Sequence, residues 1–310
     1  MSDNWLQSLH HLDTMLDEAE VAFANGRQHE HAVILEEKQV AFHHDGGPWR
    51  EALHQCWISF LQVITEGHPD EALCYCHKAC AIAQRTDLEE LRAFIDCCKA
   101  QIHLIAGDLL AGQLAGIRAL AAFEARGNIR WACRTLWLLS AITNAMMIWL
   151  SSLVYCERAL THARAIKDTR LTLVGLWRTG STLILSGAPG EGVLWCNEAL
   201  AQSPAPFDRV TIEAVRGNGL LRSGKIEEGI AQLEEATAWF KAHILWHDYS
   251  VFGMHLGEGY IQRGDMVLAH TLFEEIMMVS YDKGYGRLET KAKQYLSGIE
   301  KECPHVDTWK

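Results

Sequence analysis

The sequence predicts an all-α fold in which antiparallel helix pairs stack into a right-handed superhelical solenoid. Apolar residues recur along the chain with the period of amphipathic helices. Most of the 24 glycines stand singly at the ends of these apolar stretches, where turns between helices are expected, and only six prolines occur. Small residues also return at a nearly constant interval, which is typical of a repeat protein. No stretch reads as a linker, so we expect one domain over residues 1–310.

The composition is that of a folded chain with ample material for a core, since 49% of the residues are apolar and 22% are charged. The net charge of −11 would repel a phosphate backbone, and no basic stripe offsets it, so we expect no direct nucleic-acid partner. The acidic, amphipathic N-terminal segment lacks the features of a secretory signal. These points predict a cytoplasmic protein whose ten cysteines are reduced.

The repeat is defined by a small residue that precedes each apolar run of a second helix. Successive occurrences are 40 residues apart, except for one interval of 37 residues. In five repeats an alanine follows seven residues later, so the two small residues share one helical face and let two helices approach closely. The small residues are Ala32, Ala72, Gly112, Ser152, Gly192, Gly229 and Ala269, and the alanines are Ala79, Ala119, Ala159, Ala199 and Ala236.

This register assigns seven helix pairs and one final helix. In each pair the small residue belongs to the second helix, and the preceding apolar stretch forms the first. The final segment has apolar residues on one face and charged residues on the other. We expect it to cap the open end, because the last repeat of a solenoid must cover the apolar face of its predecessor. The pairs lie near residues 4–45, 48–86, 88–126, 128–166, 168–203, 207–244 and 247–283, and the capping helix spans 287–302.

The segment from Thr135 to Cys156 has no charged residue and is long enough to cross a bilayer. Two observations favour a buried part of the solenoid instead. Asn144 and the pair Ser151 and Ser152 interrupt its apolar character, and the repeat register divides the segment between two helices. We therefore expect no membrane-spanning helix.

The C-terminal repeats resemble the tetratricopeptide repeat family. The resemblance weakens towards the N-terminus, where only the spacing and the small residues persist. The period of 40 exceeds the usual 34 residues, so the chain is similar to the long-helix variants of regulatory and scaffolding proteins. The matching residues are Leu256, Gly257, Tyr260, Gly264, Ala269 and Phe273, then Gly217, Leu220, Gly224, Gly229, Leu233 and Ala236, then Gly180, Leu183, Gly187, Gly192 and Ala199.

In the family that the chain resembles, fixed positions of the first helices line a concave groove. The fifth of these positions is a tryptophan in three repeats, at Trp57, Trp137 and Trp177. Aromatic area surrounded by hydrogen-bonding groups is typical of a peptide or small-ligand site. The alternative is that these tryptophans pack between helices as core residues. The neighbouring groove positions are Gln101, Arg134, Asn144, Ser181, Asn218, Arg222 and Glu258.

A group of cysteines invites a metal or redox interpretation. The spacing of zinc ligands, C-x-x-C, is absent, and the thiols share a helical register with isolated cysteines in other repeats, so we interpret them as small apolar filler and predict no metal and no cofactor. Two glycine-rich segments, 187–192 and 219–225, are turns between helices rather than phosphate-binding loops. The cysteines in question, for which a metal or redox role stays open, are Cys74, Cys76, Cys80, Cys97 and Cys98.

No nucleophile elbow or paired carboxylates stand out, so we predict that the chain is not an enzyme. The interpretation that requires no feature beyond those seen in the sequence is an interaction protein. Such a protein binds a peptide or protein partner in its concave groove as a scaffold, an adaptor or a subunit of a larger complex. The alternative is a regulatory sensor, in which a small molecule or signalling peptide enters the groove and modulates a partner. The oligomeric state is left open by the sequence.

Overall fold

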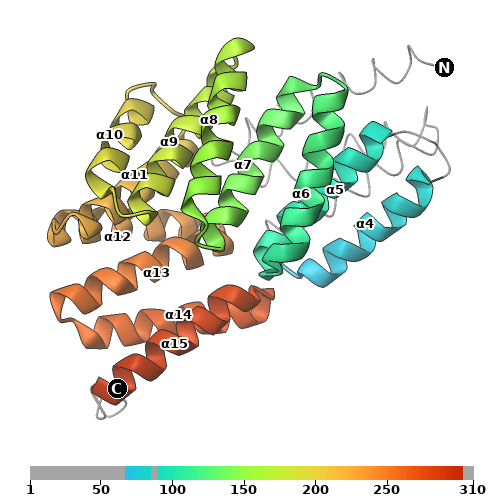
Figure 1. The fold of residues 1–310 in the computed structure, drawn as a ribbon. Coiled ribbons are helices and arrows are strands. Elements are labelled where there is room, and N and C mark those ends of the chain that lie inside the picture. Colours follow the sequence, from blue (N-terminus) through green and yellow to red (C-terminus); the bar gives the residue numbers. More distant parts are fainter. Residues whose placement is uncertain (1–66, 85–88, 303–310) are drawn as a thin grey trace.

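The computed structural model describes residues 67–84 and 89–302, and the helices in these ranges confirm the predicted all-α solenoid (Figure 1). Trp57 and the first predicted pair lie outside the described residues. The described helices are α4 (Pro69–Ala83), α5 (Glu89–Ala106), α6 (Leu109–Ala125), α7 (Ile129–Ala145), α8 (Trp149–Ala165), α9 (Thr169–Leu185), α10 (Pro189–Leu200), α11 (Pro206–Arg222), α12 (Ile226–Ala242), α13 (Trp246–Arg263), α14 (Met266–Lys283) and α15 (Gly286–Glu302).

The helices form two layers that curve together. Each helix packs against the next one along the chain, and in addition α5, α7, α9, α11, α13 and α15 contact one another in sequence. These first helices therefore make the inner, concave layer, while α6, α8, α10, α12 and α14 lie outside them (Figure 1).

Local sequence signals place several of the helix starts. The side chains of Asp108, Asn128 and Asp168 each accept a hydrogen bond from the backbone N–H three residues later, at 3.2, 3.3 and 2.9 Å. Such a cap satisfies one of the amide groups that a helix leaves unpaired at its N-terminus. The interval of 37 residues in the repeat coincides with a short helix, because α10 has 12 residues where the other outer helices from α6 to α14 have 17 or 18.

The uncharged segment from residue 135 to 156 is divided between two helices. The helix α7 ends at Ala145 and α8 begins at Trp149, with Met147 in the left-handed conformation between them. Among the described helices, none has the length and apolar character needed to cross a membrane.

The inner layer closes on itself. The backbone N–H of His68, just before α4, donates to the carbonyl of Lys283 at the end of α14, at 3.0 Å, and α15 contacts α5. A Cβ on Gly67 would lie 2.5 Å from the carbonyl oxygen of Lys283, and one on Gly107 would lie 2.9 Å from the Cβ of Arg287. We call these five residues the closure seam. Figure 1 shows the start of α4 beside the junction of α14 and α15.

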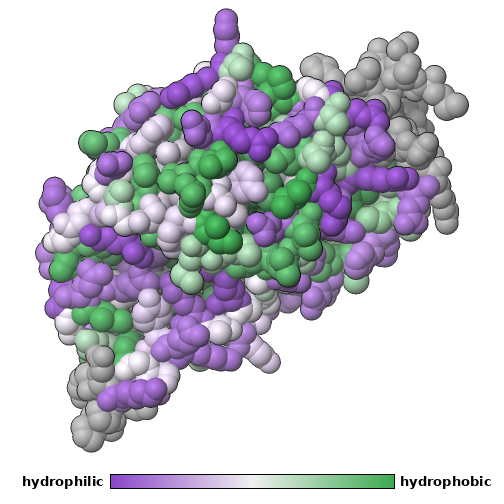
Figure 2. Space-filling model, viewed as in Figure 1, coloured by the Kyte–Doolittle hydropathy of each residue, from purple (hydrophilic) through white to green (hydrophobic). Residues whose placement is uncertain are grey.

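The outer helices expose apolar side chains among polar ones. Leu110 and Leu114 on α6, and Leu150 and Val154 on α8, have between 46% and 77% of their surface exposed. On the face shown in Figure 2, hydrophobic residues gather in the middle of the surface and hydrophilic residues dominate its margins.

Candidate functional site: a pocket in the concave layer

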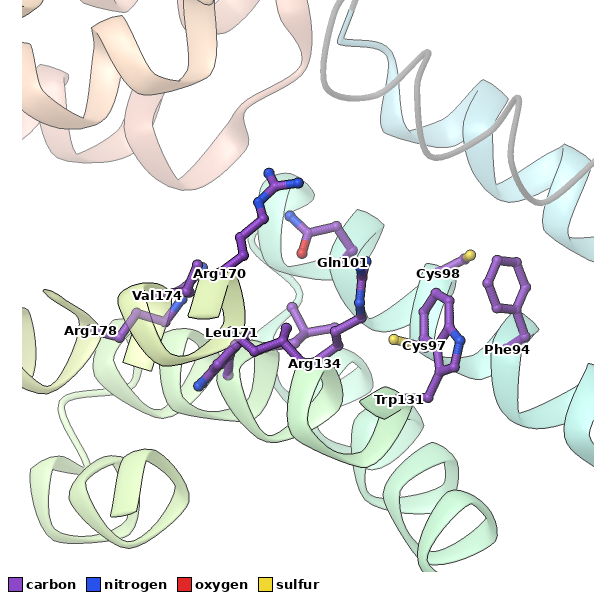
Figure 3. A pocket seen from close by; sticks show the side chains of 12 residues that line it. Phe94, Cys97, Cys98, Gln101, Trp131, Arg134, Arg170, Leu171, Val174 and Arg178 are labelled. Atoms are coloured by element: carbon purple, nitrogen blue, oxygen red, sulfur yellow. The ribbon is translucent and has the colours of Figure 1, made fainter. Parts of the chain in front are cut away.

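A cavity of about 210 Å³ opens on the inner layer where α5, α7 and α9 meet (Figure 3). We call it the inner pocket. An engineered cavity of about 150 Å³ holds benzene, so this volume suits one large side chain or a chain end rather than a whole peptide. Its lining residues are Phe94, Cys97, Cys98 and Gln101 of α5, Trp131, Arg134, Trp137 and Leu138 of α7, and Arg170, Leu171, Val174 and Arg178 of α9.

The 40-residue repeat explains why these side chains meet. Phe94, Arg134 and Val174 occupy one register position in three successive first helices, and Cys98, Leu138 and Arg178 occupy another. Adjacent repeats stack with little change of orientation, so equivalent positions form rows across the concave layer. The inner pocket is the meeting point of several such rows.

One end of the inner pocket is cationic. Arg134, Arg170 and Arg178 are three of its twelve described lining residues, and none of the twelve is acidic. In the view of Figure 3, Arg170 and Arg178 lie on one side, Gln101 and Arg134 in the middle, and Phe94 and Trp131 on the far side. Clustered cations are conspicuous here because the chain as a whole carries a net charge of −11.

Arg178 is held by an aromatic contact. Its guanidinium lies 4.6 Å from the ring centroid of Trp177, close enough for a cation–π interaction. Its Nε atom is buried without a hydrogen-bond partner among the described residues. Desolvation lowers the pKa of this guanidinium, although the charge of Asp248 opposes the effect.

The opposite end of the inner pocket is apolar. The ring of Trp131 packs edge-on against Phe94, with 4.9 Å between centroids, and stacks on Phe123 at 5.8 Å. Burial raises the pKa of the Cys97 thiol to about 12, so this group stays protonated at neutral pH. The hydroxyl of Thr135 donates to its sulfur at 3.7 Å. Cys97 therefore contributes an apolar wall and not a reactive thiolate.

The predicted groove residues separate into three groups. Gln101, Arg134 and Trp137 line the inner pocket. Trp137 is only 5% exposed, and its Nε1–H lacks a hydrogen-bond partner among the described residues, so it combines packing in the core with a position at the pocket wall. Trp177 packs against the core behind Arg178 and lies outside the pocket lining.

Two further predicted residues lie on the inner helices without reaching the inner pocket. The side-chain N–H of Asn144 donates to the hydroxyl of Thr182, at 2.9 Å, and joins α7 to α9. Ser181 is half-buried on α9, one turn beyond Trp177.

The remaining predicted residues form a separate polar cluster around Glu258, which we call the Glu258 network. The carboxylate of Glu258 on α13 accepts hydrogen bonds from Lys291, at 3.1 Å, and from the hydroxyl of Tyr295, both on α15. Arg222 of α11 lies 3.6 Å from the same carboxylate and donates to Asn218 at 3.1 Å. Asn218, Arg222 and Glu258 thus join three inner helices to each other.

The charge balance of the Glu258 network favours an ionised carboxylate. Burial by itself would raise the pKa of Glu258, but the hydrogen bond and charge of His255, together with Lys291 and Tyr295, outweigh burial and lower that pKa well below its usual range. The separation of His255 Nδ1 from the carboxylate is 3.3 Å.

A second titratable group faces the interior from α13, and sequence reasoning did not single it out. Burial raises the pKa of Asp248 to about 6, and burial lowers the pKa of its neighbour His247 to about 4. The ring of His247 packs edge-on against Tyr285 at 5.4 Å, and the charge of Arg287 lowers its pKa further. The charge of Asp248 acts on Arg178 of the inner pocket, and the charge of Arg287 of the closure seam acts on His247.

The cysteine cluster has no metal-binding geometry within residues 67–84 and 89–302, where no three potential ligands converge. Cys74 is exposed, Cys76 and Cys98 are buried, and Cys80 accepts a hydrogen bond from Lys99 at 3.0 Å. None of these cysteines forms a disulfide.

The helix layers and their register define the chain as an all-helical, tetratricopeptide-like repeat protein. No family model matches the sequence, and no curated protein matches it. Solved structures do share the fold. NprR in complex with its cognate peptide NprX is 13% identical, with a TM-score of 0.69 over 96% of this chain and 83% of that one.

Two more structures show the same arrangement. A Rap protein complexed with competence and sporulation factor is 10% identical, with a TM-score of 0.58 over 96% of this chain and 99% of that one. Aspartyl phosphate phosphatase F from Bacillus subtilis is 12% identical, with a TM-score of 0.54 over 87% of this chain and 74% of that one. At these identities the likeness concerns the fold alone.

Proposed function

We propose that this chain is a non-catalytic peptide-binding protein, and that a peptide lies along the concave layer with one of its groups in the inner pocket. The observation that carries the proposal is the inner pocket itself, an amphipathic cavity in the layer that a tetratricopeptide-like solenoid presents to its partners. The peptide complex of NprR, which shares the fold, supports a peptide as the occupant.

Binding is favoured over catalysis by the chemistry of the inner pocket. Cysteine is a common nucleophile in enzymes, but burial raises the pKa of Cys97 to about 12, so its thiol stays protonated at neutral pH. Besides the thiol of Cys98 and the indole N–H groups, the polar groups of the lining are arginines and a glutamine, which bind and orient ligands but are poor general bases. An aspartyl phosphate phosphatase shares the fold, so the fold by itself is compatible with either function.

One observation favours the regulatory alternative within this proposal. The closure seam joins the two ends of the described part of the inner layer, so a ligand that changes the curvature of this part also strains that seam. We therefore propose that the bound peptide controls the interaction with a partner protein rather than serving as a passive attachment point. A cytoplasmic location, predicted from the sequence, is consistent with this role.

The test is a selection of peptides from a pool of random heptapeptides on the full chain, followed by calorimetric titration of the enriched peptides. Val174→Trp fills the inner pocket, and we expect it to weaken binding at least 10-fold. Val154→Trp introduces the same change on the outer face of α8 and should leave affinity unchanged. Thermal melts check that both variants are folded. Failure to enrich any peptide, or equal binding by both variants, contradicts the proposal.

A further inference from the structure

A thiol and an amine from neighbouring helices are in direct contact outside the lining of the inner pocket. The ammonium group of Lys99 on α5 donates a hydrogen bond to the sulfur of Cys80 on α4, with 3.0 Å between Nζ and Sγ. In the part of the chain that the structure describes, Lys99 forms no ion pair with a carboxylate, so this sulfur is its polar partner. Lysines usually keep their charged end in water, and a half-buried ammonium that contacts sulfur is therefore unusual.

The neighbouring charges leave the ammonium of Lys99 to this sulfur. Asp96, three residues before Lys99 on α5, binds Arg118 of α6 through two hydrogen bonds of 2.9 Å. The bonding with Asp96 raises the pKa of the Arg118 guanidinium, and the charge of Cys80 acts in the same direction. Cys80 is therefore within electrostatic reach of Arg118. Because Asp96 is already engaged by Arg118, it does not compete with the sulfur for Lys99.

Cys80 combines this contact with partial exposure. It is half-buried near the C-terminal end of α4, whereas Cys76, one turn earlier, is fully buried. Cys74 on the same helix is exposed but accepts no hydrogen bond from an amine of the described residues. Reactive cysteines are typically partly exposed and lie beside a cation. Cys80 meets both conditions, whereas burial raises the pKa of Cys97 to about 12.

This geometry allows an oxidation that joins the two side chains. A Cys80 thiolate attacks one oxygen of hydrogen peroxide, which breaks the O–O bond, gives a sulfenic acid and releases hydroxide. The hydroxide takes a proton from the adjacent Lys99 ammonium and becomes water. The neutral amine then attacks the sulfenic sulfur, so that an S–N bond forms and the S–O bond breaks. The departing oxygen leaves as a second water molecule with the proton that the amine loses.

We propose that Cys80 and Lys99 form a peroxide-dependent S–N crosslink between α4 and α5. The two atoms are already within hydrogen-bond distance, and the flexible four-carbon stem of lysine brings them to bonding distance. A dithiol reverses the crosslink, because one thiol attacks the sulfur and releases the amine, and the other closes a cyclic disulfide and releases the thiol of Cys80. Since α4 begins at the closure seam, the crosslink ties α5 to that seam.

The experiment treats the full chain with hydrogen peroxide in slight excess and digests it without a reductant, using a Glu-specific protease. Mass spectrometry should find the peptides of Cys80 and Lys99 joined, with two hydrogen atoms fewer than the two free peptides together. Dithiothreitol should release both peptides unchanged. The crosslink joins residues 19 positions apart, so oxidation should raise the melting temperature by roughly 5 °C, and dithiothreitol should cancel the rise.

Substitutions assign the crosslink to this pair. Lys99→Arg keeps a cation but replaces the amine by a guanidinium that stays protonated, so the joined peptides should disappear. Cys80 should still form a sulfenic acid in this variant, which dimedone traps, and Cys80→Ser should remove both signals. Cys74→Ser removes an exposed thiol from the same helix and should leave the crosslink yield unchanged. Thermal melts before oxidation check that each variant is folded.

The results that overturn the inference are specific to this pair. One is peroxide treatment that leaves Cys80 unoxidised, and another is oxidation of Cys80 that ends in a disulfide or a sulfinic acid without joining Lys99. A third is a set of joined peptides that persists in the folded Lys99→Arg variant. Peptide binding by the wild-type chain is measured separately, so none of these results affects the proposed function.

Discussion

The backbones of Gly180 and Gly192 touch between α9 and α10. A Cβ on Gly192 would lie 2.5 Å from the carbonyl oxygen of Gly180, and a Cβ on Gly180 would lie 2.8 Å from the carbonyl oxygen of Gly192. The inner and outer helices of this repeat are therefore in main-chain contact. Gly217 and Gly229 repeat the relationship in the next pair, where a Cβ on Gly229 would lie 2.8 Å from the carbonyl oxygen of Gly217.

Gly192→Ala should force α9 and α10 apart and lower the free energy of unfolding by about 1–3 kcal/mol, the usual cost of overpacking. Gly190→Ala is the matched control in the same helix, because no described atom lies within 4 Å of the position that its Cβ would take. It should be neutral or stabilise by up to about 1 kcal/mol through helix propensity. Urea denaturation of both variants measures the difference, and equal stabilities contradict the contact.

Glu258→Gln should cost about 1–3 kcal/mol of stability at pH 7, because the Glu258 network loses the negative charge that Lys291 and Arg222 face. The pKa of Glu258 is lowered in the folded chain, so its stabilising contribution is complete above the unfolded pKa of about 4.3. The contribution is lost as the pH falls below that value. Denaturation of wild type and variant at pH 7 and near pH 3 should show a difference that shrinks in acid.

Asp248 and His247 should give opposite pH dependences of stability. The folded pKa of Asp248 is about 6, so its contribution is present below the unfolded pKa of about 3.9 and is lost as the pH rises through about 6. The folded pKa of His247 is about 4, so its contribution is present above the unfolded pKa of about 6.5 and is lost as the pH falls through about 4.

Between about pH 4 and 6.5 the titrations of Asp248 and His247 change the stability of the wild type in opposite directions, so single variants are needed to separate them. Between about pH 4 and 6.5, Asp248→Asn should gain stability relative to the wild type as the pH rises, and His247→Asn should lose it. Each change is of the order of 1–3 kcal/mol. Denaturant titrations at several pH values test this prediction, and parallel curves for all three proteins contradict it.

Ile244→Gly should stabilise the chain by about 1 kcal/mol. Ile244 has a φ of 60° in the turn between α12 and α13, a conformation that β-branched residues rarely adopt, and its side chain is 62% exposed. Little packing is lost when it is removed. Thermal melts measure the gain; Ile244→Val, which keeps the β-branched strain, serves as the control and should not melt higher than the wild type.

The repeat register was predictable from the sequence because burial follows the period. The small residues Ala72, Ser152 and Ala269 are all fully buried, and α7 and α8 divide the uncharged segment as the register requires. The left-handed turn residues were predictable only where they are glycine. Met147, Lys167 and Ile244 occupy equivalent turn positions without any signal in their residue types.

The region around the inner pocket was predictable in part. Gln101, Arg134 and Trp137 follow from the groove positions of the resembled family. Arg170 and Arg178 were missed, although both lie on the same first helix as the predicted Trp177, which Arg178 directly follows. The pairing of Glu258 with α15 and the approach of Asp248 to Arg178 depend on the curvature of the solenoid, which the period does not specify.

The closure seam has a consequence for how the chain folds. In an open solenoid every contact is between near neighbours in sequence, so repeats fold and unfold almost independently. His68 and Lys283 are more than 200 residues apart, and joining them costs roughly 5 kcal/mol of chain entropy. Because of this cost, we expect the contact to form after the intervening repeats. It couples the first described helix to the last. Unfolding of any one described repeat therefore also strains the contact between the first and last described helices.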